Sequence, residues 1–291
     1  MSLDFNGLYY VQFVSRSSKL IMKVNKIIYT ARTKYQFVEI VDFEEFGLSL
    51  ILDGLVQSTV ADEYIYHETL VHPAMISHPE PRKVLIIGGG EGATLREVLK
   101  YSSVEKAVMV DIDGELIDIA KHYLEPMHQG SFNDPRAELV IMDGKEYIKK
   151  TEYRFDVIIL DLTDPYSSEI AKDLYSEPFY RELKKILNEK GIIVTQAGSS
   201  FYFEDAYDLS LNSLKKTFNI VREYNTWIPS FGYSINYIVA SDTIDPLQLH
   251  EKTIDQKLTD RKIYTKYYNG SIHEAVFKSP ALRNIYLKKA S

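Results

Sequence analysis

The sequence of 291 residues predicts an α/β fold, in which a mostly parallel sheet with helices on both faces follows a small antiparallel β domain. Three observations lead to this class. The first sixty residues alternate apolar and polar side chains, a helical stripe follows, and apolar runs then alternate with helix-like segments to about residue 245. Continuous apolar strands that alternate with helices are typical of parallel sheets covered on both sides.

Residues 1–60 are expected to form an N-terminal β-stranded domain. Their apolar positions are rich in aromatic and β-branched side chains and recur with a period of two, the pattern of an antiparallel meander. A turn at Asp53-Gly54 follows the last of these runs. The predicted strands lie at residues 8–14, 20–24, 36–41 and 48–52.

Residues 61–245 are expected to form the larger α/β domain. A helical stripe runs from Tyr64 to Ile76 and ends near the prolines at 79 and 81. Residues 246–291 are polar and predict a C-terminal helix or tail. Further helices are predicted at residues 93–100, 115–123 and 179–187, and strands at residues 84–87, 107–110, 137–141, 157–160, 192–195, 218–221 and 235–240.

Composition excludes several classes of function. The chain has no cysteine, which excludes disulfides, thiolate metal sites and cysteine nucleophiles. It has no apolar window of about 18 residues and no basic start followed by an apolar stretch, so we expect a soluble, cytoplasmic protein without a membrane partner. The net charge of −7 has the wrong sign for a nucleic-acid partner bound through phosphate neutralisation.

A glycine-rich turn, Gly88-Gly-Gly-Glu-Gly92, stands between a predicted strand and a predicted helix. Glycines at this first turn let a nucleotide or nucleoside approach the backbone, here at Gly88 and Gly90. Asp111 ends the next strand about twenty residues later, where an acid can bind ribose hydroxyls. A tight turn used only for packing is the alternative.

Glu91 lies inside this turn and indicates which ligand it holds. A carboxylate there would repel a pyrophosphate but would attract an amine or a sulfonium. The turn therefore favours S-adenosyl chemistry over a nicotinamide dehydrogenase. Asp143, after the third strand of the larger domain, could read an adenine amino group or cap a helix over residues 144–150.

Two acids, Asp161 and Asp164, follow the fourth of these strands. Ligands of such sheets bind outside the carboxyl ends of the strands, so both should face the same crevice as the glycine turn. The pair could bind a divalent metal, share a proton or hold a cationic substrate, and Asp164 could instead form a turn before Pro165. No histidine cluster accompanies the pair, and we predict no metal site. His67 on the preceding helix stands outside any zinc motif, and a lone histidine there is more often structural than catalytic.

Taken in order, several segments between about Tyr35 and Ser241 resemble the polyamine aminopropyltransferases, the spermidine synthase family. Each segment is modest alone, but the ordered set is specific. The segments are Asp53-Gly-Leu-Val-Gln57, Asp62-Glu-Tyr-Ile-Tyr-His-Glu68, Gly88-Gly-Gly-Glu-Gly92, Asp111-Ile-Asp113, Asp143-Gly144, Asp161-Leu-Thr-Asp-Pro165 and Ile228-Pro-Ser-Phe231.

The resemblance implies a methyltransferase-like Rossmann domain behind the β domain. It also implies that an aminopropyl group moves from decarboxylated S-adenosylmethionine to an amine, with release of 5′-methylthioadenosine. The donor would be a co-substrate, no cofactor would be needed, and the chain would form a homodimer or homotetramer. The implied nucleoside contacts are Gln36, Asp111, Asp143 and Gly144, together with the glycine turn.

The same resemblance implies the residues of the amine site. Asp161 would accept the proton from the attacking nitrogen. The polyamine or the aminopropyl amine would contact His67, Glu91 and Asp164, in a pocket lined by Tyr66, Gln57 and Phe231.

The chain departs from the family pattern at a few positions. Glu91 stands where many putrescine-using members have Asp, and Phe231 stands where they commonly have Tyr. Both are more similar to the branch that acts on agmatine or on longer polyamines. The segment Tyr166-Ser-Ser168 replaces a common Gly-Pro turn. The acceptor could therefore be putrescine, agmatine or spermidine.

Two other functions remain open from the residues alone. An S-adenosylmethionine-dependent methyltransferase would share the sheet, the glycine turn and the ribose acid. Glu91 disfavours a methyltransferase, because such an enzyme must accommodate the methionine carboxylate, which Glu91 would repel. A non-catalytic binding protein would have no need of an acid at the Asp161 position.

Overall fold

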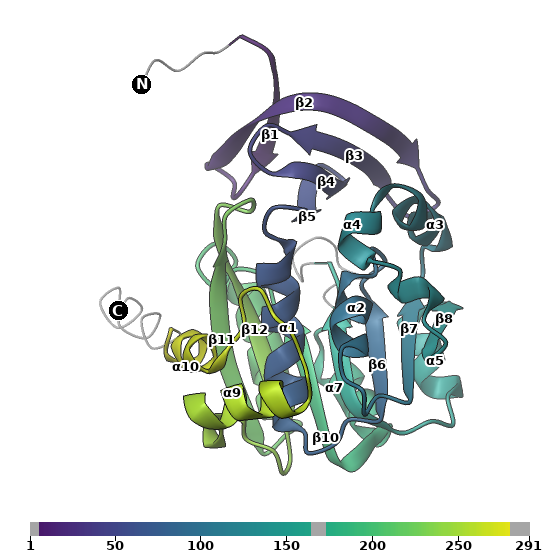
Figure 1. The fold of residues 1–291 in the computed structure, drawn as a ribbon, viewed down its shortest axis with the longest axis vertical. Helices are drawn as coiled ribbons and strands as arrows, with labels where there is room; N and C mark the ends of the chain where they lie inside the picture. The colour runs from purple at the N-terminus through teal and green to yellow at the C-terminus, as the bar shows by residue number, and fades with distance from the viewer. Residues whose placement is uncertain (1–5, 164–172, 280–291) are drawn as a thin grey trace.

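Two separate sheets organise the chain, as Figure 1 shows. The structure is a computed structural model that describes residues 6–163 and 173–279. The N-terminal sheet has five strands in chain order, and every neighbouring pair is antiparallel, so the predicted meander is confirmed. The strands are β1 (Leu8–Phe13), β2 (Lys19–Arg32), β3 (Phe37–Phe43), β4 (Gly47–Leu52) and β5 (Leu55–Thr59).

Strand β2 differs most from its predicted length. It has 14 residues, whereas the alternation in the sequence supports a strand only to Val24. Its pairing with β3 shifts register between Val24 and Lys26 and again between Ile27 and Tyr29. A bulge places two residues opposite one and interrupts the period of two, which explains why the pattern hides the second half of the strand.

Helix α1 (Glu63–Ser77) descends from the small sheet along one face of the large one (Figure 1). It ends just before His78, as the following prolines predict. Nearly all of its residues are buried, including Glu63, His67 and Glu68. Buried charges are tolerated when they are paired, so this helix must find partners on its neighbours.

The larger sheet has seven strands in the order β11-β12-β10-β9-β6-β7-β8. All neighbours are parallel except that β12 runs antiparallel to β10 and β11. The chain leaves β6 in one direction and returns to pair with it through β9, so the topological switch point lies between these two strands. The strands are β6 (Lys83–Gly88), β7 (Lys106–Asp111), β8 (Ala137–Ile141), β9 (Phe155–Asp161), β10 (Leu187–Gln196), β11 (Ile220–Ile228) and β12 (Tyr233–Ser241).

Helices cover both faces of this sheet, as predicted. One apolar core lies under α1, α2 and α3, and a second lies under α5, α7 and α8. Helix α8 was not predicted, and α7 ends two residues early because Leu187 already pairs with Phe155 in β10. No helix in the described ranges is long and apolar enough to cross a membrane. The helices after α1 are α2 (Ala93–Leu99), α3 (Gly114–Tyr123), α4 (Glu125–His128), α5 (Gly144–Lys150), α7 (Glu177–Lys185), α8 (Glu204–Lys215), α9 (Glu251–Asp260) and α10 (Gly270–Lys278).

The C-terminal segment is anchored to α1 by Glu68. This carboxylate is 1% exposed and accepts hydrogen bonds from the backbone N–H groups of Lys266, Tyr267 and Tyr268, each at 2.8 Å. Beyond this contact, α10 lies along α9 and β11. The segment predicted as a helix or tail is thus docked on the larger domain by a buried charge.

We expect Glu68→Ala to lower the free energy of unfolding by about 3–5 kcal/mol, because three N–H groups lose their shared acceptor. Glu146→Ala is the control, since Glu146 forms an exposed ion pair with Lys150 and its loss should cost about 0.5 kcal/mol or less. Urea unfolding at a fixed protein concentration measures both. Equal costs for the two variants would show that Glu68 does not anchor the segment.

Candidate active site

The glycine turn after β6 meets the end of β9. Gly88 pairs with Asp161 in the sheet, and the N–H of Gly89 donates to the carbonyl oxygen of Asp161 at 3.0 Å. Gly88 has a φ of +85°, and a Cβ there would overlap that same carbonyl oxygen. Only glycine therefore lets the turn and the strand end approach this closely.

The side chain of Asp161 is held by two hydroxyl groups. Tyr66 donates to Oδ1 at 2.8 Å and Thr94 donates to Oδ2 at 2.6 Å. Burial raises the pKa of Asp161 above its usual range, although His67 and the two hydroxyl groups act in the opposite direction. The result is a fixed carboxylate with more affinity for a proton than an exposed aspartate has.

The sequence alone suggested that His67 is a lone histidine, but the structure places it between two carboxylates. Its Nδ1 lies 2.8 Å from Oε2 of Glu63, and its Nε2 lies 2.9 Å from Oε1 of Glu91. Burial by itself would lower the pKa of His67, but the carboxylates of Glu91 and Glu63 outweigh it and raise the pKa well above the usual value. The structure thus joins two of the predicted site residues, His67 and Glu91, in one buried ion pair.

A small cavity opens beside Tyr66 and brings three predicted residues together. Gln57 on β5, Tyr66 on α1 and Phe231 in the turn before β12 all line it, and the rings of Tyr66 and Phe231 are 6.1 Å apart. Its other walls include Gln12 and Gln196. Neither residue was predicted. Gln12 lies in β1, 45 positions before Gln57, and nothing in its local sequence marks it as a site residue.

The predicted nucleoside residues lie along the neighbouring strand ends. Asp111 ends β7, and burial raises its pKa to about 6. A Cβ on Gly90 would come within 2.9 Å of Oδ2 of Asp111, so the bare backbone of the turn faces this acid. Gln36 donates through Nε2 to Oδ2 of Asp113 at 2.8 Å, which ties the N-terminal sheet to the start of α3.

Asp143 and Gly144 begin α5. Oδ1 of Asp143 accepts the backbone N–H groups of Lys145 and Glu146, at 2.8 and 3.1 Å, so the capping role considered from the sequence is present. A Cβ on Gly144 would come within 2.7 Å of Ile87. An adenine-reading role for Asp143 stays a prediction. Asp164, the second acid of the predicted pair, lies outside the described residues.

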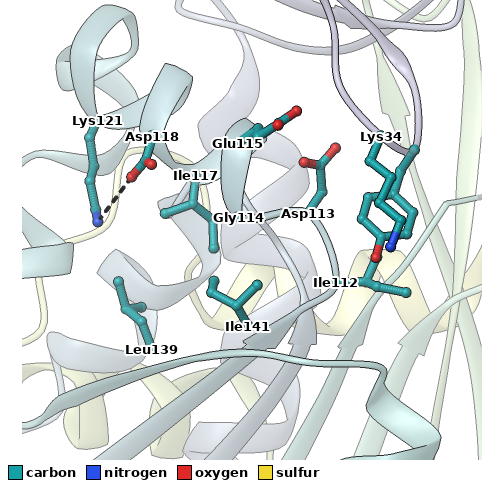
Figure 2. Close-up of a pocket in the computed structure, with 11 residues that line it drawn as sticks. Lys34, Ile112, Asp113, Gly114, Glu115, Ile117, Asp118, Lys121, Leu139 and Ile141 are labelled. Atoms are coloured by element: carbon teal, nitrogen blue, oxygen red, sulfur yellow. Dashed lines mark ion pairs between the residues drawn. The ribbon is translucent and has the colours of Figure 1, made fainter.

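A groove of about 480 Å³ adjoins this region. Figure 2 shows the residues that line it. Ile117, Leu139 and Ile141 form an apolar floor, while Lys34 and Asp113 stand at one end. None of Asp111, Asp143 and the glycine turn lines it. The groove adjoins the predicted nucleoside residues through Ile112, which follows Asp111, and through Asp113, which accepts a hydrogen bond from Gln36. Among the described residues, no three histidine or acidic side chains are grouped as a metal site requires.

Comparison with known proteins identifies the family of the chain. Residues 63–251 match the model of the spermine/spermidine synthase domain, and residues 9–59 match the spermidine synthase tetramerisation domain. The chain belongs to the spermine/spermidine synthase family. It is accordingly an aminopropyltransferase. The family assignment favours this activity over the methyltransferase and the binding protein considered above.

Curated relatives in this family align over most of the chain. A polyamine aminopropyltransferase of Pyrobaculum aerophilum is 50% identical over 94% of both chains. Polyamine aminopropyltransferase 1 of Hyperthermus butylicus is 51% identical over 86% of this chain and 87% of its own.

Solved spermidine synthases share the fold. One, described as a complex with the transition-state analogue AdoDATO, superposes with a TM-score of 0.88 at 38% identity over 94% of this chain and 92% of its own. Spermidine synthase from Thermotoga maritima gives a TM-score of 0.86 at 38% identity, over 94% of this chain and 91% of its own.

Proposed function

We propose that this enzyme transfers the aminopropyl group of decarboxylated S-adenosylmethionine to an amine acceptor and releases 5′-methylthioadenosine, with Asp161 as the proton acceptor. The observation that carries this proposal is the position of Asp161. Its carboxylate lies at the switch point of the sheet, against the glycine turn and hydrogen-bonded to Tyr66, which lines the neighbouring cavity. The relative solved with AdoDATO, a transition-state analogue, supports the same reaction.

The proposed step is a direct displacement. The acceptor nitrogen forms a bond to the aminopropyl carbon next to sulfur, and the carbon–sulfur bond breaks with its electron pair left on sulfur. The positively charged sulfonium becomes a neutral thioether, so the donor supplies its own leaving group and no cofactor is needed. The proton lost from the attacking nitrogen passes to the carboxylate of Asp161.

The amine must reach the donor without its proton. An amine resembling that of lysine has a pKa of about 10, so removing the proton at neutral pH costs about 4 kcal/mol. A carboxylate near the amine attracts it but also favours its charged form. We therefore assign separate roles to the acids: Glu91, held by His67, contacts the aminopropyl or acceptor amine, and Asp161 takes the proton.

We expect Tyr66→Phe to shift the acid limb of the pH profile to higher pH. Asp161 must be ionised to accept a proton, so kcat/KM rises with pH through the pKa of this group. The hydroxyl of Tyr66 lowers that pKa, and its removal raises it. Rates with saturating donor between pH 5 and 9 measure the shift, and an unchanged acid limb would contradict the assignment.

We further propose that the enzyme is a cytoplasmic homodimer or homotetramer that associates through the N-terminal sheet. Val11 on β1 and Ile21 on β2 lie opposite each other and are 46% and 60% exposed, and Phe13 nearby is 56% exposed. Exposed apolar side chains gathered on one sheet indicate a contact surface. Sedimentation of Ile21→Lys, compared with the unchanged chain, tests this.

The test of the reaction is release of 5′-methylthioadenosine from decarboxylated S-adenosylmethionine with putrescine, agmatine, cadaverine or spermidine in parallel. S-adenosylmethionine serves as the control donor. Release with the decarboxylated donor and one amine establishes the reaction and the acceptor. Preference for agmatine or spermidine would agree with Glu91 and Phe231, whereas turnover of S-adenosylmethionine alone would contradict the proposal.

A further inference from the structure

A line of side chains with alternating charge connects α2 to the carboxylate of Glu91. The guanidinium of Arg96 pairs with both oxygens of Glu63, each at 2.9 Å, and its Nε donates to Glu97 at 2.8 Å. Arg96, Glu63 and Glu97 are all less than a tenth exposed. A two-pronged pair of this kind fixes orientation as well as charge.

His67 is the next member of this line. Oε2 of Glu63 is shared between Arg96 and Nδ1 of His67, and Nε2 of His67 faces Glu91 at 2.9 Å. A histidine donates from both ring nitrogens only as an imidazolium, so contact with two carboxylates requires the charged form. The other titratable groups that face this ring are Tyr66, whose ring meets it edge-on, and Asp161.

We propose that Arg96 and Glu63 are positioning residues, which hold His67 as an imidazolium and through it fix the Glu91 carboxylate at the amine site. That the amine binds there rests on the proposed function. Arg96 offsets the charge of Glu63, which would otherwise be buried without a partner. Glu91 and Glu63 together keep His67 protonated, Glu63 through its hydrogen bond to Nδ1, and the ion pair between Nε2 of His67 and Oε1 of Glu91 holds the Glu91 carboxylate in place.

Loss of the charge on Glu63 has a defined consequence. A neutral His67 keeps its Nδ1–H on the backbone carbonyl of Glu63, which lies 2.8 Å away. Its Nε2 then presents a lone pair to Glu91, and the two acceptors repel each other. Glu91 then loses its fixed position, and Arg96 keeps Glu97 as its remaining charged partner.

The test follows the imidazole of His67 by NMR in protein labelled at its seven histidines, with His67→Asn used to assign the signal. In the unchanged chain we expect His67 to stay an imidazolium from pH 6 to 9. In Glu63→Gln we expect it to titrate within this range. Over the same range, kcat/KM for the amine should fall about tenfold relative to the unchanged chain, the effect of losing one charged hydrogen bond.

Two further variants separate positioning from stability. Glu97→Gln removes an equally buried carboxylate from the other side of Arg96, so it should lower stability but leave the His67 titration unchanged. Glu63→Asp keeps the charge and should restore the imidazolium.

Three outcomes would overturn the proposal. The first is that His67 in the unchanged chain titrates near the usual pKa of histidine; this outcome counts even if Glu63→Gln fails to fold. A folded Glu63→Gln variant in which His67 stays charged would also overturn it. So would a Glu97→Gln variant that shifts the pKa of His67 as much as Glu63→Gln does. The NMR measurement needs no substrate, so failure of the aminopropyl transfer itself would be recognised separately.

Discussion

Asp161→Asn is expected to lower kcat by about 10²–10⁴-fold, because the amide cannot accept the proton from the attacking amine. Asparagine has the shape of aspartate and still offers an oxygen to the hydroxyl of Tyr66, which donates to Asp161 at 2.8 Å. Donor binding should therefore stay within about threefold. Single-turnover release of 5′-methylthioadenosine measures the chemical step, and calorimetry measures donor affinity.

The control for this variant is Asp156→Asn. Asp156 lies on the same strand, β9, but at its opposite end, where it accepts hydrogen bonds from the backbone of Arg82 and Lys83. Its replacement should leave kcat unchanged. If Asp161→Asn retained a kcat within tenfold of the unchanged chain, another group would have to accept the proton, and the proposed role would be wrong.

Gly88→Ala is expected to reduce both stability and activity. The residue has a left-handed backbone conformation, which costs an alanine about 1–2 kcal/mol. The added Cβ also overlaps the carbonyl oxygen of Asp161, a backbone atom of the central sheet that cannot move away alone. Separating the turn from the strand should bring the total loss of unfolding free energy to about 4 kcal/mol.

The same displacement should lower kcat/KM by about 10²-fold, since a shift of about 1 Å in a catalytic group has an effect of this size. Gly130→Ala is a matched control, because Gly130 has a φ of +80° and an added Cβ would have nothing within 4 Å. It should show only the conformational cost. If the two variants lost equal stability and kept equal activity, close approach would not be the reason for glycine at position 88.

Much of the fold follows from local patterns. Alternation predicted β1 to β4 but not β5, which follows the turn at Asp53-Gly54. Apolar runs between helices predicted the central strands of the larger sheet. The second half of β2 was not predicted, because two register shifts remove the alternation there. Helix α8 was not predicted either, although its residues 204–215 lie between two predicted strands.

The candidate site was predicted only in part, because local patterns reveal strand ends but not contacts between distant segments. The glycine turn, Asp111 and Asp161 each stand at the end of a recognisable strand, and parallel strands bring their carboxyl ends together. Gln12 and Arg96 carry no such signal. Gln12 reaches the cavity from an outer strand of the other sheet, and Arg96 contacts Glu63 across 33 positions of the sequence.

The sequence by itself determined the two-part architecture, the edge of the sheet where the candidate site was expected and the residue types available there. These follow from periodicity and from strand ends, which are properties of short segments. Only the tertiary structure decided that His67 lies between Glu63 and Glu91, that Glu68 anchors the C-terminal segment and that Gln36 contacts Asp113. Such contacts depend on buried charges finding partners on distant elements once water is excluded, and no local pattern contains that information.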